Sequence, residues 1–184
     1  MAEAWVEDVL DFWFKDLTRQ DWFSGGPELD EKVRARFLPL YEKLKSSFSA
    51  KSTADARTAL AAIIVFDQFP RNMFRGTPAA FATDDLALAI SRLSIEKKFD
   101  ADLDDDAKAF LYMPFMHSEV AADQERCVDL FRSLPNAEES IKYAIEHRDI
   151  VAKFGRFPHR NYILGRESTE AEIEFLKTHA GYGQ

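Results

Sequence analysis

A phrase whose residues could bind an anion occurs twice in the sequence. Residues 66–72 read F-D-Q-F-P-R-N, and residues 154–161 read F-G-R-F-P-H-R-N. In each copy an apolar run of helical spacing reaches a proline, which is expected to end the helix, so the arginine and the asparagine lie just beyond the helix end. An arginine guanidinium binds a carboxylate or a phosphate through two parallel hydrogen bonds. Two matching helix ends therefore predict one shared site built from distant parts of the chain.

The predicted site would bind a small anionic molecule. Arg71 and Arg160, helped by Arg75 or Arg156, would hold the anion, and the asparagines would orient it. The residues of the two segments predicted to contact the ligand are Gln68, Arg71, Asn72, Arg75, Arg156, His159, Arg160 and Asn161. An alternative stays open, because arginines after a helix also complement its exposed carbonyl groups, and the prolines would then only stop helices. The alternative does not explain why asparagine follows arginine in both copies.

Polar side chains also interrupt the apolar stripes of three predicted helices. Asp67 continues a stripe that includes Ile64, His117 and Gln124 belong to a second stripe, and His147 lies on a third. A buried polar group without a partner costs about 1–3 kcal/mol. We therefore expect these inward-facing groups, which come from different helices, to meet one another.

The inward-facing residues supply the candidate catalytic groups. His117 is the predicted general acid or base, since histidine titrates near neutral pH, and Asp67 or His147 would fix its tautomer. Each also has a structural interpretation: Asp67 could pair with Arg71 one helical turn away, and His147 could donate to a backbone carbonyl. No serine or cysteine nucleophile stands out, so acid–base chemistry through water is favoured over covalent catalysis. Whether the chain is an enzyme stays open.

Two further acids complete the predicted ligand-binding residues together with Gln124. Glu119 and Asp123 are spaced i,i+4 and would share a helical face that could hold a cation, although an exposed acidic face is the alternative. His117 and Glu119, two positions apart on a helix, would point in different directions, so no metal site is predicted. The sequence contains no Gly-rich phosphate loop, nucleophile elbow or H-E-x-x-H zinc motif, and it leaves any cofactor unknown.

The elements that would position these residues are all helices, because every periodic stretch has helical spacing and none alternates as a strand. Successive predicted helices cover residues 2–15, 27–48, 53–69, a segment from 83, residues 104–113, 118–134 and 136–155, and a short segment from 169. The expected N-caps include Thr83, Asp104, Asn136 and Thr169, the last two in capping boxes with Glu139 and Glu172. Gly155 is predicted to end its helix in the left-handed conformation. About eight helices in antiparallel pairs indicate an all-α chain.

Size and composition restrict the class of protein. A chain of 184 residues fits one domain, 1–184, and its 16 phenylalanines imply an aromatic core. A net charge of -8 argues against a general partner for nucleic acid or acidic membranes. The single Cys127 cannot form an internal disulfide and is interpreted as a small core residue. Without a signal peptide or a membrane span, the expected location is the cytoplasm.

Several segments together resemble a known family. Residues 66–72, 80–84, 113–119 with 123–124, and 154–161 and the ending 181–184 are similar to the bacterial domain-of-unknown-function family 924. The resemblance covers nearly the whole chain. It implies a TPR-like α-α superhelical fold and no established activity. The residues that carry it are His, Asp, Gln, Arg and Asn at helix ends and on inward stripes, which favour a small-molecule pocket over an exposed peptide groove.

Two functions therefore remain. The first is a pocket for a small anionic molecule, which in one form is an enzyme using acid–base chemistry. The second is a non-catalytic TPR-like module that binds a peptide or protein and contains a structural buried polar network. A closed pocket lined by both arginine–asparagine segments would favour the first, and a long open groove would favour the second. The sequence does not identify the ligand, a protein partner or the oligomeric state.

Overall fold

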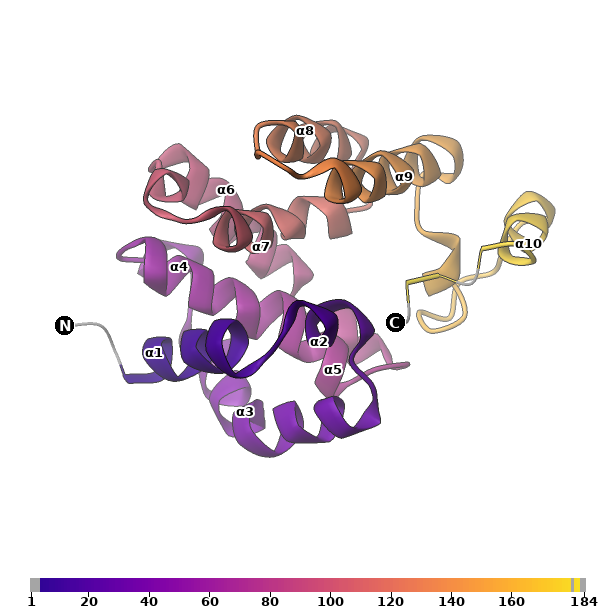
Figure 1. Cartoon of the computed structure of the whole chain (residues 1–184). Helices are drawn as coiled ribbons and strands as arrows, with labels where there is room; N and C mark the ends of the chain where they lie inside the picture. Colours follow the sequence, from indigo (N-terminus) through magenta and orange to yellow (C-terminus); the bar gives the residue numbers. More distant parts are fainter. Residues whose placement is uncertain (1–3, 180, 183–184) are drawn as a thin grey trace.

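The computed structural model describes residues 4–179 and 181–182, and all regular structure within them is helical (Figure 1). The α-helices are α1 (Ala4–Asp11), α2 (Arg19–Ser24), α3 (Pro27–Ser47), α4 (Ala56–Ile63), α5 (Phe69–Met73), α6 (Asp84–Glu96), α7 (Asp105–His117), α8 (Ala121–Arg132), α9 (Glu138–Phe154) and α10 (Glu170–Leu176). The all-α fold class is confirmed.

The helices form two groups with α7 facing the space between them. In Figure 1, α1, α2, α3 and α5 form the lower part of the molecule, and α6, α8 and α9 lie above it. From α6 to α9 each helix packs against the next, as α6 with α7, α7 with α8, and α8 with α9. The segment containing α10 lies to one side, and the chain then turns back towards the body. None of the helices in the described ranges is both long and apolar enough to span a membrane.

Aromatic side chains fill the main core, as the phenylalanine content predicts. The ring of Phe69 stacks on that of Phe37 at a centroid distance of 4.5 Å and meets Trp13 edge-on at 5.8 Å. Trp13 in turn contacts Phe110 of α7. Offset and edge-on packing of this kind stabilises aromatic clusters beyond the effect of burial alone. The cluster joins α7 to the π-helical turn Phe12–Asp16 after α1, and through it to α5 and α3, and therefore fixes the base of the site described below.

Neither proline of the repeated phrase ends a helix, and Pro114 does not end the predicted helix 104–113. Pro158 follows Gly155, which already ends α9. After α4 the chain continues through a π-helical turn, Ile64–Gln68, into α5, where Pro70 occupies the first turn. The first turn tolerates proline because a backbone N–H there has no intrahelical acceptor. Pro114 lies inside α7, which continues to His117. Asp67 therefore lies on a π-helical turn and not in the last turn of a helix that ends at residue 69. His117 is the last residue of α7 and does not belong to a loop before the predicted helix 118–134.

The local start and stop signals have mixed outcomes. Asp104 and Thr169 cap α7 and α10 as predicted, and Gly155 ends α9 with a φ of 71°. Thr83 does not cap α6, because its hydroxyl donates to the carbonyl of Phe66 at 2.6 Å instead. The capping box expected at Asn136 is also absent, since this residue adopts a left-handed conformation and Ala137 precedes α9.

Two other expectations are corrected by where helices begin. Val120 belongs to the stripe predicted to contain His117 and Gln124, but it is 55% exposed because α8 starts only after it. The sequence interpretation also missed α2, although Thr18 and Asp21 form a capping box at its start. This short helix contributes Trp22 and Phe23 to the lining of a cleft that residues of α7 also line.

Candidate functional site

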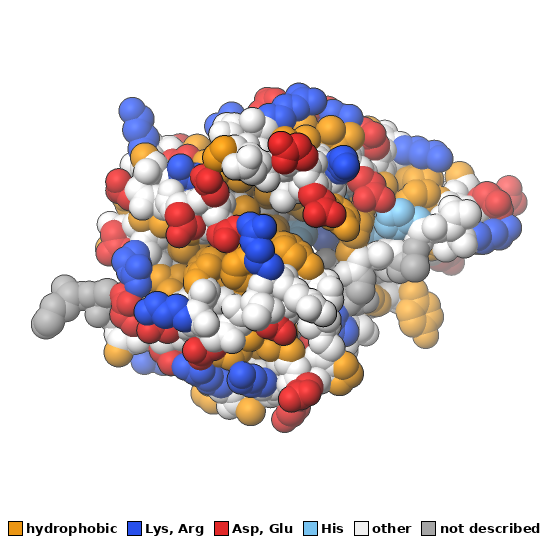
Figure 2. Space-filling model, in the orientation of Figure 1, with side chains coloured by type: hydrophobic (Ala, Val, Ile, Leu, Met, Phe, Trp, Pro, Cys, Tyr) orange, Lys and Arg blue, Asp and Glu red, His pale blue; other side chains and the backbone are white. Residues whose placement is uncertain are grey.

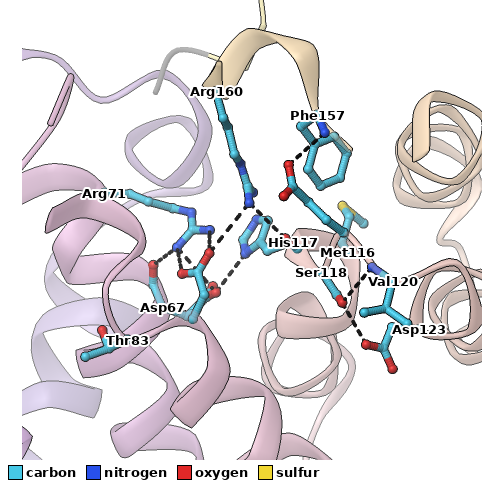
Figure 3. A network of polar contacts seen from close by, with 12 residues as sticks. Asp67, Arg71, Thr83, Met116, His117, Ser118, Val120, Asp123, Phe157 and Arg160 are labelled. Atoms are coloured by element: carbon cyan, nitrogen blue, oxygen red, sulfur yellow. Dashed lines mark hydrogen bonds and ion pairs between the residues drawn. The ribbon is translucent and has the colours of Figure 1, made fainter. Parts of the chain in front are cut away.

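Asp67 lies at the centre of a buried polar cluster, on the π-helical turn between α4 and α5 (Figure 3). Its carboxylate is fully buried and accepts hydrogen bonds from Gln68 Nε2 at 2.5 Å and His117 Nδ1 at 2.7 Å. Arg71 NH1 lies 3.5 Å from the same carboxylate. Burial alone would raise the pKa of Asp67, but His117 and Arg71 hold it at about 2. Asp67 is therefore charged at neutral pH, and the prediction that it is buried beside an arginine is confirmed.

His117 has a defined tautomer because of Asp67. An ionised carboxylate only accepts hydrogen bonds, so Nδ1 of His117 carries the proton that Asp67 binds. Burial and the neighbouring Arg71 lower the pKa of His117, which keeps the imidazole neutral at pH 7. Its other nitrogen, Nε2, then carries a lone pair and has no hydrogen-bond partner among residues 4–179 and 181–182. The geometry is that of a histidine base oriented by an aspartate.

Arg71 and Arg160, one from each copy of the repeated phrase, converge on Asp84. Arg71 donates to both carboxylate oxygens of Asp84, at 2.8 and 3.0 Å, while Arg160 NH1 lies 3.8 Å from that carboxylate. Both guanidinium groups lie over the ring of Phe81, at 5.7 and 4.6 Å. Figure 3 shows Arg160 reaching into the cluster from the C-terminal segment, where NH1 donates to the carbonyl of His117 at 3.1 Å. The two arginine segments therefore approach one another, with His117 beside them.

The charge of Arg160 is only partly compensated. Burial, followed by repulsion from Arg71, lowers the pKa of Arg160 to about 10. The Nε atoms of Arg71 and Arg160 are buried and have no hydrogen-bond partner in the described part of the chain. Asp67 and Asp84 match the two arginines in number, but the contact of Arg160 with Asp84 is longer than those of Arg71 with either acid.

The asparagines of the repeated phrase do not join the arginines. Asn72 donates to Asp30 of α3 at 2.8 Å, and Arg75 pairs with the same carboxylate at 2.7 and 2.9 Å. These contacts attach the end of α5 to α3. Asn72 in α5 and Arg75 in the turn after it, both predicted to bind the ligand, therefore pair with α3 and do not join the cluster.

The second copy is anchored in the same manner to α10. Arg156 donates to Glu172 at 2.7 and 2.8 Å, and Asn161 donates to Ser168 at 3.0 Å and to Glu172 at 3.3 Å. Arg156 and Asn161 are thus also directed away from the arginine pair. In each copy the asparagine that follows the arginine is hydrogen-bonded to a side chain of another segment. Neither asparagine lines the cleft that contains Arg71 and His117.

Glu119 and Asp123 do not share a helical face, because Glu119 precedes α8. Glu119 accepts hydrogen bonds from the backbone N–H of Phe157 at 2.8 Å and from Arg166 at 2.7 and 3.0 Å. Sequence reasoning did not identify Arg166. The Glu119 contacts join the turn after His117 to the segment that carries Arg160.

Two residues in the first turn of α8, Asp123 and Gln124, bind the residues on either side of His117. Asp123 is buried and accepts from Ser118 Oγ at 2.7 Å and also from Arg92. Gln124 is fully buried and donates to the carbonyls of Met116 and Ser118, both at 2.7 Å. These two residues, predicted to bind the ligand, instead hold the turn that follows α7.

His147 lies in a second, aromatic part of the site. Its Nδ1 donates to the carbonyl of Tyr143 at 2.7 Å, and its ring stacks on Tyr182 at 4.0 Å. Burial lowers the pKa of His147 to about 3 and that of His159 to about 4, so both rings are neutral at pH 7. Both nitrogens of His159 are buried without a partner in the described ranges. His147 does not contact His117 directly, so Asp67 is the residue that orients His117.

A cleft of about 910 Å³ is lined by Arg71 and His117 together with His147 and Tyr182, and residues of α7 line it along its length. Its polar lining includes Gln68, Arg71, His117, Tyr143, His147 and Tyr182. Figure 2 shows this face hollowed between the lower helices and the α8–α9 pair, with hydrophobic side chains inside and acidic side chains along its upper edge. The cleft presents Arg71 and His117 to a ligand and leaves Arg160 behind them.

The described residues contain no group of three or more His, Cys, Asp or Glu side chains that could hold a metal ion. Cys127 is buried, and burial raises the pKa of its thiol, which disfavours the nucleophilic thiolate. Asp84 is the main site residue that sequence reasoning did not select. It stood within the segment 80–84 that carries part of the family resemblance.

Comparisons with known proteins agree with that resemblance. A family model described as "Bacterial protein of unknown function (DUF924)" matches residues 9–180. A solved structure titled as a protein of unknown function, ATU0120 from Agrobacterium tumefaciens, is 38% identical, with a TM-score of 0.89, covering 96% of this chain and 98% of that one. A search of curated proteins finds no match. The chain belongs to the bacterial DUF924 family.

Proposed function

We propose that the chain binds a small carboxylate-bearing molecule in the cleft and that His117 acts on it as a general base. The observation that carries the proposal is the buried Asp67–His117 pair, with a 2.7 Å hydrogen bond that leaves Nε2 of a cleft-lining histidine unpartnered among the described residues. The same arrangement of aspartate, histidine and free nitrogen serves proton transfer in many hydrolases.

The charge distribution supports a ligand with one anionic group. Asp84 and Asp67 compensate most of the charge of Arg71, whereas the nearest carboxylate oxygen to Arg160 is 3.8 Å away. The two arginines are already matched in number by Asp67 and Asp84, so a bound carboxylate adds one negative charge beside them and a polyanion would add several. The proposed ligand is therefore a single carboxylate and not a polyphosphate.

The proposed chemistry is activation of water. A water molecule next to Nε2 of His117 would give up a proton to it while attacking an ester or amide carbonyl of the ligand. The C–O or C–N bond to the leaving group would then break, and the imidazolium of His117 would return the proton to the departing alcohol or amine. The Asp67 carboxylate would stabilise the imidazolium that forms, and Arg71 would hold the carboxylate end of the ligand. The lowered pKa of His117 keeps the base in its neutral form at pH 7. No step needs a serine or a cysteine.

A panel of fluorogenic esters and amides that carry a free carboxylate tests this proposal. We expect turnover that falls at least about 100-fold in His117→Asn, since general-base catalysis contributes this much or more. Arg71→Gln should weaken substrate binding, and the matched control Arg75→Gln, which lies outside the cleft, should not. Circular dichroism would show that each variant is folded. Turnover that survives in His117→Asn would refute the base. A wild-type protein that neither binds nor converts any of the compounds would favour the interaction-module alternative.

A further inference from the structure

One half of the cleft takes no part in the proposed chemistry. Large apolar side chains line it from α2, α7 and residues 131–134. They are Trp22, Phe23, Phe110, Met113, Phe131 and Leu134. Phe23 is 69% exposed, which is unusual for a phenylalanine in a chain whose other aromatic rings mostly fill the core. An exposed apolar surface inside a cleft is typical of a ligand-contact surface.

This aromatic wall is held in place before any ligand binds. The indole N–H of Trp22 donates to the carbonyl of Trp13 at 2.8 Å, and the Trp22 ring meets Phe110 edge-on at 5.0 Å. Phe23 lies nearly parallel to Phe110, at 6.5 Å and an interplanar angle of 9°. The capping box of Thr18 fixes the start of α2. A preformed wall binds a ligand without the entropic cost of ordering its side chains.

Helix α7 sets the distance between this wall and the polar end. Phe110 and His117 both line the cleft from α7 and are seven residues apart, which corresponds to ~10 Å along the helix axis. The α7 residues that line the cleft between them are Met113 and Met116. The floor between the arginine end and the aromatic wall is therefore apolar and continuous.

We propose that the ligand is a monocarboxylate with an ester or amide bond and an apolar tail, whose carboxylate lies against Arg71 and whose tail extends along α7 to Phe110 and Phe23. This inference rests on the proposed function and adds the class of substrate to it. A tail of ~10 Å places an unbranched acyl chain of intermediate length, or a phenyl ring on a short linker, between the two ends.

The edge of the cleft restricts the far end of the tail. Asp105 and Glu139 line the cleft near the start of α7 and α9, and Asp106 there pairs with Arg19. A second carboxylate at the end of the tail would face Asp105 and Glu139 and would be repelled. The ligand is therefore expected to end in an apolar group, so a dicarboxylate of the same length is a matched negative probe.

Isothermal titration calorimetry of the full chain with acetate, octanoate, suberate and octanol tests this proposal. Since each buried methylene strengthens binding about fourfold, we expect octanoate to bind at least about 100-fold more tightly than acetate. Suberate should bind at least about tenfold more weakly than octanoate, because of the acids at the edge. Phe23→Ser should weaken octanoate binding several-fold and leave acetate binding unchanged. Tyr162→Ser, at a 94% exposed aromatic residue outside the cleft lining, is the matched control.

The outcomes separate the tail from the headgroup. Acetate and octanoate that bind equally, both weakened by Arg71→Gln, would overturn the apolar tail and leave the proposed function standing. Octanol that binds as tightly as octanoate, with no effect of Arg71→Gln, would overturn the carboxylate headgroup and the proposed function with it. Octanoate binding that is unchanged in Phe23→Ser would overturn the aromatic wall as the tail site. Failure of all four probes to bind would overturn both proposals.

Discussion

Replacing Asp67 by asparagine should destabilise the fold strongly although it keeps the shape of the side chain. The carboxylate is fully buried, accepts hydrogen bonds from Gln68 and His117, and lies 3.5 Å from Arg71. Removing one partner of a buried charged pair leaves the other buried without compensation and costs about 3–5 kcal/mol. Asp84 still compensates part of the charge of Arg71, so we expect a loss near the lower end, about 3 kcal/mol in the free energy of unfolding.

Urea denaturation at pH 7, followed by far-UV circular dichroism and tryptophan fluorescence, measures this loss. Asp102→Asn, at an exposed aspartate, is the matched control and should stay within about 0.5 kcal/mol of wild type. An Asp67→Asn variant within the same range of wild type would refute the assignment of Asp67 as the charged centre of the cluster.

The same variant has an expected pH signature. The pKa of Asp67 is held at about 2, below its ordinary value of 3.8, so the folded protein binds this proton less readily than the unfolded chain does. The resulting stabilisation is complete above about pH 4 and is lost as the pH falls towards 2. The difference between wild type and Asp67→Asn should therefore narrow below about pH 4. A difference that stays constant from pH 6 to pH 3 would contradict the charge-based explanation.

Three further predictions concern other parts of the structure. Burial lowers the pKa of His147 to about 3, so the unfolded chain binds this proton at a higher pH than the folded protein does. The free energy of unfolding should therefore fall as the pH drops below about 6.5. In urea titrations at pH 7, 6, 5 and 4, His147→Gln should reduce this slope. Gly155→Ala should lower thermal stability by about 1 kcal/mol, since φ there is 71°; an unchanged melting temperature would contradict the left-handed helix end. Glu172→Gln removes the ion pair with Arg156 and should let α10 open locally. Amide hydrogen exchange should then be at least about tenfold faster in residues 156–176 and unchanged in α3. Equal acceleration in both regions would instead mean global destabilisation.

The sequence alone determined the features that depend on near neighbours. Helical periodicity predicted the all-α class, and it placed Asp67, His117, Gln124 and His147 on buried positions, because the side-chain period of a helix decides which residues face the core. The caps at Asp104 and Thr169 were predictable for a similar reason, since a cap involves residues three positions apart.

Local signals failed where packing decided between nearly equal conformations. Pro70 and Pro114 were expected to end helices, but a π-helical turn before α5 and the surrounding core allow both to stay within helical segments. The hydroxyl of Thr83 had two acceptable partners, and the carbonyl of Phe66, 17 residues earlier, was the one that the fold brought within reach.

Only the tertiary structure decided which polar groups meet. The repeated phrase predicted that Arg71 and Arg160 approach one another, but Asp84, which joins them, lies 13 residues from one and 76 from the other. The tertiary structure also separated each arginine side chain from that of the asparagine beside it, because adjacent residues in a helical turn point in different directions. Ion pairs between distant residues depend on how helices pack, and the chain does not encode that distance in any local pattern of residues.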